Sequence, residues 1–205
     1  GTTGCIAGQT KLPSHLTTPD PIEMFEILRI MADAGVEVVC MEVSAHALYL
    51  RKLVGVVFEA AAYTNLSQDH LDLHGTMDEY AAAKKKIFSQ CRMGCVNADD
   101  ERAPFMLEGA KCPMLTYSAA GGDAKLKAEN VYLTGEGVHF EAVYGAERVQ
   151  TELSIPGMFS VYNALGIIAA GLSLGISLEK CAHALSSAKG VKGRMERVPT
   201  DGDYS

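Results

Sequence analysis

The stretch "VFEAAAYTNLSQDHLDLHGTMDEYAAAKKKIFSQCRMGCVN", residues 57–97, holds a strand, a loop, a helix and a second strand in that order. Residues 57–64 and 93–97 are short apolar runs, which are typical of buried strands. Between them, from about Thr76, apolar residues recur three and four positions apart, which predicts a helix. A strand, a helix and a strand in succession indicate two parallel strands joined by a crossover.

The same alternation extends on both sides of this stretch. Patterns of apolar residues predict helices over 22–34, 45–52 and 101–108 and strands over 36–43 and 114–117. Residues 125–155 change to three short alternating segments between glycine-rich turns, which predicts an antiparallel meander. Helices over 158–174 and 178–188 follow. The predicted fold is α/β, a mostly parallel sheet flanked by helices, with a small antiparallel three-stranded β subdomain.

The composition excludes several classes of protein. The 205 residues are 48% hydrophobic, enough for a large core, and their net charge of -7 argues against sequence-independent binding of nucleic acid. No run of 18 apolar residues and no basic-then-apolar leader indicates a membrane span or a secretory signal. Six scattered cysteines favour a reduced, cytoplasmic setting. We expect Cys91 and Cys95 to pack in the core, because no second pair completes a zinc site.

A carboxylate, Glu42, lies at the carboxyl end of the predicted strand 36–43, with Ser44 and His46 in the turn after it. Ligands of open parallel sheets bind at that edge, where a carboxylate suits a magnesium ion. A helix-capping or surface glutamate is the alternative, and this feature alone does not choose between them.

The loop after strand 57–64 is rich in acidic and imidazole groups, namely Asp69, His70, Asp72 and His74. It belongs to the same predicted edge of the sheet. Such a cluster suits metal binding or proton transfer, whereas a hydrogen-bonded turn would explain the same composition without chemistry.

Lys84 interrupts the apolar face of the predicted helix, which otherwise carries Met77, Tyr80, Ala83 and Ile87. A buried ammonium group is costly unless it is paired. One reading is a long side chain that reaches a nearby carboxylate. The other is a neutral amine that reacts with carbon dioxide, so that its carbamate becomes an anionic metal ligand.

Six segments in order closely resemble the Mur ligase family, and within it the MurE type: "LTTPDP" (16–21), "MEVSAHAL" (41–48), "TNLSQDHLDLHGTMDEYAAAK" (64–84), "VNADD" (96–100), "PGMFSVYNAL" (156–165) and "GRMERV" (193–198). The resemblance implies that residues 1–197 form the central, P-loop NTPase-like domain of a three-domain ligase. The family's phosphate loop would precede Gly1, and residues 198–205 would begin the hinge to the C-terminal domain. We therefore expect this chain by itself to be inactive.

The resemblance also implies roles for single residues. Those at the metal and the catalytic centre are Glu42, His70 and a carbamylated Lys84; those at the muramoyl-peptide substrate are Thr17, Thr18, Ser44 and Lys52; Asn163 belongs to the adenine and Arg194 to the nucleotide phosphates. Two positions depart from the family pattern. Ser160 stands where many members have asparagine, and Lys52 stands where arginine is frequent.

The implied reaction uses ATP and Mg²⁺ to add a dibasic amino acid, L-lysine or meso-diaminopimelate, to UDP-MurNAc-L-Ala-D-Glu through an acyl phosphate. Its partners are these small molecules, with no nucleic acid and no membrane span. The sequence does not tell which amino acid is added. A related amide ligase such as folylpolyglutamate synthetase, a metal-dependent hydrolase and a non-catalytic binding module are the alternatives.

Overall fold

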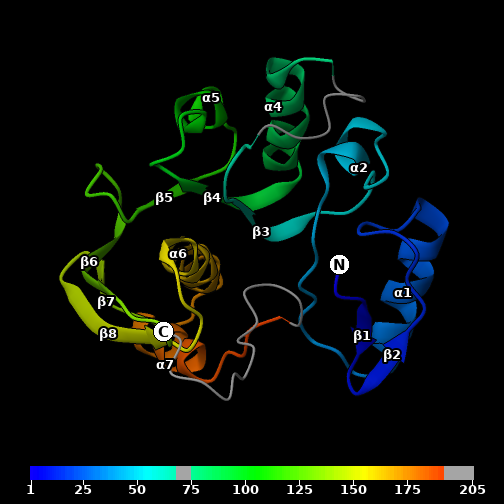
Figure 1. The fold of residues 1–205 in the computed structure, drawn as a ribbon. Coiled ribbons are helices and arrows are strands. Elements are labelled where there is room, and N and C mark those ends of the chain that lie inside the picture. Colours follow the sequence, from blue (N-terminus) through cyan, green and yellow to red (C-terminus); the bar gives the residue numbers. More distant parts are fainter. Residues whose placement is uncertain (68–74, 192–205) are drawn as a thin grey trace, which may run out of the picture. The chain divides into compact units, whose positions relative to one another are not determined.

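The computed structural model describes residues 1–67 and 75–191. They form two compact units, one of residues 1–56 with 75–87 and one of residues 57–67 with 88–191. The elements of the first unit are β1 (Cys5–Ala7), β2 (Thr10–Leu12), α1 (Pro21–Asp33), α2 (Ala45–Tyr49) and α4 (Met77–Lys85) (Figure 1).

In the first unit, β1 and β2 pair as an antiparallel hairpin that the sequence did not predict. Helix α1 packs against it, with Ala7 of the hairpin and Ile27 and Met31 of the helix in one apolar cluster. The helix begins at Pro21, whose fixed φ and missing N–H suit a first helical position. Its predicted range of 22–34 is thus confirmed to within a residue at each end.

Helix α4 begins with a capping box, in which the Thr76 hydroxyl accepts from the Glu79 amide and the Glu79 carboxylate accepts from the Thr76 amide. Tyr80 and Ala83 of the predicted apolar face are buried, and α4 contacts α2. Lys84 is half-buried on this helix. The predicted helix and its buried face are therefore confirmed, whereas Lys84 is only partly buried, as is its neighbour Lys85.

The predicted strand 36–43 is not formed. Its backbone pairs with no other strand in the described part of the chain. Val38 and Val39 remain 72% and 41% exposed. Strand preference reflects packing against neighbours more than an intrinsic backbone tendency, so an apolar run without a neighbouring strand stays irregular.

The second unit contains a six-stranded sheet of β3 (Phe58–Tyr63), β4 (Cys91–Asn97), β5 (Met114–Ser118), β6 (Leu126–Leu133), β7 (Val138–Tyr144) and β8 (Glu147–Leu153), in that spatial order. Neighbours from β3 to β6 are parallel, and the β6–β7 and β7–β8 pairs are antiparallel. This confirms both the parallel sheet and the meander. The meander continues the sheet through the β5–β6 pairing instead of forming a sheet of its own.

Helix α6 (Met158–Ser173) lies in the hollow of this curved sheet, and α5 (Ala103–Leu107) lies on the other side of its parallel half (Figure 1). Val161, Leu165 and Ile168 of α6 are fully buried in the core. Helix α7 (Leu178–Ser186) packs against β8 and α6. No helix within residues 1–67 and 75–191 has both the length and the apolar character that crossing a bilayer requires.

Candidate functional site

One threonine connects the loop before α1 with the turn before α2. The Thr18 hydroxyl donates to the Glu42 carbonyl oxygen at 3.0 Å and accepts from the Ser44 amide at 3.0 Å. Ser44 in turn caps α2 by accepting from the Ala47 amide at 3.1 Å. Because Thr18 is only 3% exposed, its hydroxyl serves the protein interior and fixes the turn that carries Glu42.

The Glu42 side chain is exposed and belongs to a group of oxygen atoms. Its Oε2 accepts from the Thr2 hydroxyl at 2.5 Å, and Thr2 Oγ1 lies 3.5 Å from Thr17 Oγ1. Carboxylate and hydroxyl oxygens are hard donors, so the residues present fit a magnesium ion. The sequence did not point to Thr2, because no motif that was identified contains it.

Described residues alone supply only part of a metal site. Within 1–67 and 75–191, no three His, Cys, Asp or Glu side chains gather closely enough to hold a metal ion by themselves. The predicted ligand His70, with the rest of its Asp/His loop from Asp69 to His74, lies outside the described residues, and so does Arg194.

Lys84 lies on a helix that packs beside the one following Glu42. Its Nζ is 5.2 Å from the centroid of the Tyr80 ring, within range of a cation–π contact. Helices α4 and α2 are in contact, and Lys86 Nζ lies 5.5 Å from the ring centroid of Tyr49 on α2. The fold therefore brings the elements of Glu42 and Lys84 together.

Lys52 forms an ion pair with Asp20, the residue that precedes α1. Its Nζ lies 2.6 Å from the Asp20 carboxylate, and its side chain is 17% exposed. The pair holds the "TTPDP" loop against the end of α2. The contact predicted between Lys52 and substrate stays a prediction.

In the second unit, one carboxylate organises the carboxyl ends of β4 and β5. Asp99 accepts from the Ser118 hydroxyl at 2.7 Å and from the amides of Ala119 and Ala120 at 2.7 and 2.9 Å. It also shares a hydrogen bond with the Tyr162 hydroxyl on α6. The loop after β5 is thus tied to the first turns of α6.

The charge of Asp99 is stabilised by these donors. Burial by itself would raise the pKa of Asp99, but the hydrogen bonds from Ser118, Ala120, Ala119 and Tyr162 outweigh it and hold the pKa below its usual value. Burial, and then the charge of Asp99, raise the pKa of Tyr162. The pair therefore stays a carboxylate and a neutral phenol at neutral pH.

The neighbouring Asp100 fixes the start of the Asp/His loop. It accepts from the Tyr63 hydroxyl at 2.6 Å and from the Leu66 amide at 3.1 Å, just after β3. The Asn97 side chain donates to the Thr64 carbonyl oxygen at 3.0 Å in the same loop. The "VNADD" segment thus forms hydrogen bonds with the loop after β3 and with the loop after β5. Two acidic residues directly after a strand could have suggested this role from the sequence.

Asn163 and Ser160 lie on α6 with opposite exposure. Asn163 is exposed, whereas Ser160 is 2% exposed and its hydroxyl donates to the Pro156 carbonyl oxygen at 3.1 Å. The adenine contact predicted for Asn163 stays a prediction. The Ser160 hydroxyl is already used in a hydrogen bond within the fold.

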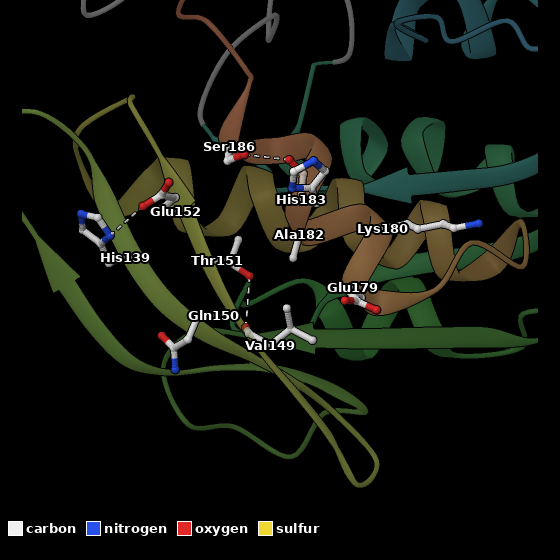
Figure 2. A pocket seen from close by; sticks show the side chains of 10 residues that line it. All are labelled: His139, Val149, Gln150, Thr151, Glu152, Glu179, Lys180, Ala182, His183 and Ser186. Atoms are coloured by element: carbon white, nitrogen blue, oxygen red, sulfur yellow. Dashed lines mark hydrogen bonds and ion pairs between the residues drawn. The ribbon is translucent and has the colours of Figure 1, made fainter.

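An open cavity of about 530 Å³ lies between α7 and the β7–β8 strands (Figure 2). His139 and Glu152 lie on its strand side, 3.7 Å apart, and Glu179 and His183 lie on its helix side. The cavity contains none of the residues predicted to be functional. Its side chains of mixed charge indicate no particular ligand.

Comparison with known proteins identifies the family of the chain. The model of the Mur ligase middle domain matches residues 1–171. The chain belongs to the Mur ligase family. It is 39% identical over 198 residues to UDP-N-acetylmuramoyl-L-alanyl-D-glutamate--2,6-diaminopimelate ligase 1 of Clostridium acetobutylicum, covering 97% of this chain and 41% of that protein. It is 39% identical over 187 residues to UDP-N-acetylmuramyl-tripeptide synthetase of Deinococcus radiodurans, covering 91% of this chain and 38% of that protein.

Among solved structures, that of a UDP-N-acetylmuramoyl-L-alanyl-D-glutamate--2,6-diaminopimelate ligase matches this Mur ligase domain with a TM-score of 0.85 and 30% identity. The match covers 98% of this chain and 42% of that one. The domain therefore spans about two-fifths of the length of these relatives.

Proposed function

We propose that this Mur ligase domain belongs to an ATP-dependent ligase that adds a dibasic amino acid, meso-diaminopimelate or L-lysine, to UDP-MurNAc-L-Ala-D-Glu. The observation that carries the proposal is the hydrogen-bonded group around Glu42, in a chain 39% identical to a ligase whose name contains both the muramoyl dipeptide and diaminopimelate. The D-glutamyl carboxylate would be activated as an acyl phosphate before the amine attacks it. A cytoplasmic location, where ATP is available, is part of the proposal.

Within this proposal, Glu42 and the hydroxyls beside it hold a magnesium ion, together with His70. When bound, the ion neutralises charge on the phosphates during transfer. Thr18 keeps the Glu42 turn in place through its two backbone hydrogen bonds. The partly exposed Thr17 and Ser44 then contact the muramoyl peptide directly. Thr18, for which the same contact was predicted, is buried and instead positions Ser44 through its hydrogen bond to the Ser44 amide.

Lys84 would act as a carbamate. A protonated lysine beside a magnesium ion would oppose the charge of the metal, whereas a carbamate supplies an anionic oxygen from a long side chain. The position of Lys84 supports the proposal, because the side chain is partly buried on α4, a helix that contacts the helix following Glu42.

On the nucleotide side, the exposed Asn163 would contact adenine, and Arg194 would lie near the phosphates. Asp99 holds the helix that carries Asn163, through the Tyr162 hydroxyl next to it in the chain. We therefore assign Asp99 a positioning role for adenine binding.

Phosphate release by the full-length protein tests the proposed function. ATP and UDP-MurNAc-L-Ala-D-Glu should give sustained phosphate release only when a dibasic amino acid is present, and mass spectrometry should detect the tripeptide product. Parallel assays with meso-diaminopimelate and L-lysine identify the amino acid. Phosphate release that needs only metal and water would support a hydrolase, and product formation with a folate substrate would support the folylpolyglutamate alternative.

A further inference from the structure

Three sulfur atoms meet at the amino ends of β4 and β5. Cys91 Sγ lies 3.7 Å from Cys112 Sγ, and Cys112 Sγ lies 3.6 Å from Met114 Sδ. All three side chains are partly exposed, so the group is open to a small ion from solvent. Nothing in the proposed ligase reaction uses these residues.

The sheet itself brings the three residues together. Strands β4 and β5 are parallel neighbours, with Gly94 paired to Met114, so Cys91 and Cys112 both lie just before this pair. The missing side chain of Gly94 leaves the space that the Met114 thioether fills, since a Cβ there would overlap Met114 Sδ. Cys95 turns elsewhere, with its Sγ 3.4 Å from the Ser173 hydroxyl.

The spacing and chemistry of the group suit one metal ion. Two sulfur ligands bound at about 2.3 Å to the same tetrahedral ion lie about 3.8 Å apart. The Cys91–Cys112 and Cys112–Met114 sulfur separations of 3.7 and 3.6 Å are both close to this value. Thiolate and thioether ligands together select soft ions, above all Cu⁺, over magnesium or calcium.

We propose that Cys91, Cys112 and Met114 form a binding site for a soft monovalent cation, with Cu⁺ as the matching ion. Binding replaces the two S–H bonds by two metal–sulfur bonds and releases two protons to solvent, while Met114 adds its thioether without losing a proton. No electron is transferred. Burial, and then the nearby Cys112, raise the pKa of Cys91 to about 12, so without the ion its thiol stays protonated.

The site lies at the opposite end of the strands from Asp99 and the loop after β5. It therefore does not rest on the proposed ligase function, and a protein without ligase activity could still bind the ion. The partial exposure that admits an ion distinguishes this group from Cys181, which is buried against α6.

Anaerobic titration of the reduced full-length protein with Cu⁺, in competition with a coloured Cu⁺ chelator, tests the site. We expect the wild type to bind one equivalent of Cu⁺ and Cys112→Ser to bind it more than about 100-fold more weakly. Loss of a residue that only hydrogen-bonds to a metal ligand already lowers metal affinity by about 10–100-fold, and Cys112 would be a ligand itself. Met114→Leu, which keeps the volume, should weaken it by about tenfold. Cys40→Ser removes an exposed thiol of the first unit and is the matched control, with wild-type affinity expected.

Equal Cu⁺ affinity of wild type, Cys112→Ser and Met114→Leu would overturn the proposal. Circular dichroism of each variant shows whether it is folded. If Cys112→Ser does not fold, the proposal is tested by comparing Met114→Leu with Cys40→Ser. Met114→Leu should then bind Cu⁺ more weakly than Cys40→Ser, and equal affinities would overturn the proposal.

Discussion

Within each unit, a single polar side chain joins segments that lie far apart in the sequence. Thr18 connects the loop before α1 to residues 42–44, and Asp99 connects β4 to the loop after β5 and to α6. Neither side chain needs to contact a ligand in order to contribute to binding. Each fixes the backbone from which a proposed binding residue projects.

Thr18→Val should destabilise the first unit. The variant keeps the shape of the side chain but leaves the Ser44 amide and the Glu42 carbonyl oxygen without their buried partner, at a cost of roughly 1–3 kcal/mol. Urea unfolding measures the change. The control Thr10→Val alters an exposed threonine of the hairpin and should stay near wild type. Equal stability of the two variants would remove the structural role from Thr18.

Asp99→Asn should cost stability in a pH-dependent way. Because folding lowers the pKa of Asp99, its charge stabilises the folded state fully above the ordinary carboxyl pKa of about 4, and this stabilisation is lost as the pH falls through the lower folded value. We expect a difference of about 1 kcal/mol at pH 7, the usual net value of a hydrogen bond at a site screened by solvent, and this difference should shrink as the pH falls below about 4. Urea unfolding across this range measures it, and a difference independent of pH would contradict the assignment.

At the scale of elements, the helices were easier to predict than the strands. The predicted helix from about Thr76 is confirmed because the capping box and the apolar face both lie within one short stretch. The prediction of a strand over residues 36–43 was wrong, and the hairpin over residues 5–12 was not predicted. Both errors arise because a strand depends on partner strands that the local sequence does not contain. For the same reason the resemblance could suggest Glu42, but not the Thr2 hydroxyl that contacts it.

Thr76→Ala should weaken α4 by about 1 kcal/mol, because it removes the acceptor for the Glu79 amide. Hydrogen exchange of the α4 amides should rise along with a loss of global stability. Glu79→Gln is the matched control, since glutamine can still accept from the Thr76 amide and keep the capping box. If both variants exchange alike, the Thr76 hydroxyl does not determine where α4 begins.

For the whole molecule, the proposed roles are divided between two units. Glu42 and Lys84 belong to the first unit and Asn163 to the second, and the relatives are more than twice as long as this chain. The proposed ligase activity should therefore be measured on the full-length protein. The amino acid that is added could not be predicted, because no described side chain has been connected with its recognition.

Lys84→Ala in the full-length protein should lower turnover by about 100-fold or more, the usual cost of losing a group that stabilises developing charge. Formate or acetate should restore part of the activity by supplying the missing carboxylate oxygen. Lys86→Ala changes an exposed lysine that follows α4 and serves as the control. Full activity of Lys84→Ala would refute the proposed carbamate. If turnover is lost and neither formate nor acetate restores it, Lys84 stabilises the structure of the site but does not supply a carbamate.

The pairing of β5 with β6 extends over only two residue pairs, Tyr117 with Leu126 and Ser118 with Lys127. Successive side chains of a strand point to opposite faces. Deleting one residue from the connection 119–125 and sliding β6 along to compensate would bring Lys127 to the core position of Leu126. The burial of Leu126 therefore opposes such a slide, so across homologous chains we expect the loop itself to absorb insertions and deletions while the β5–β6 register is kept.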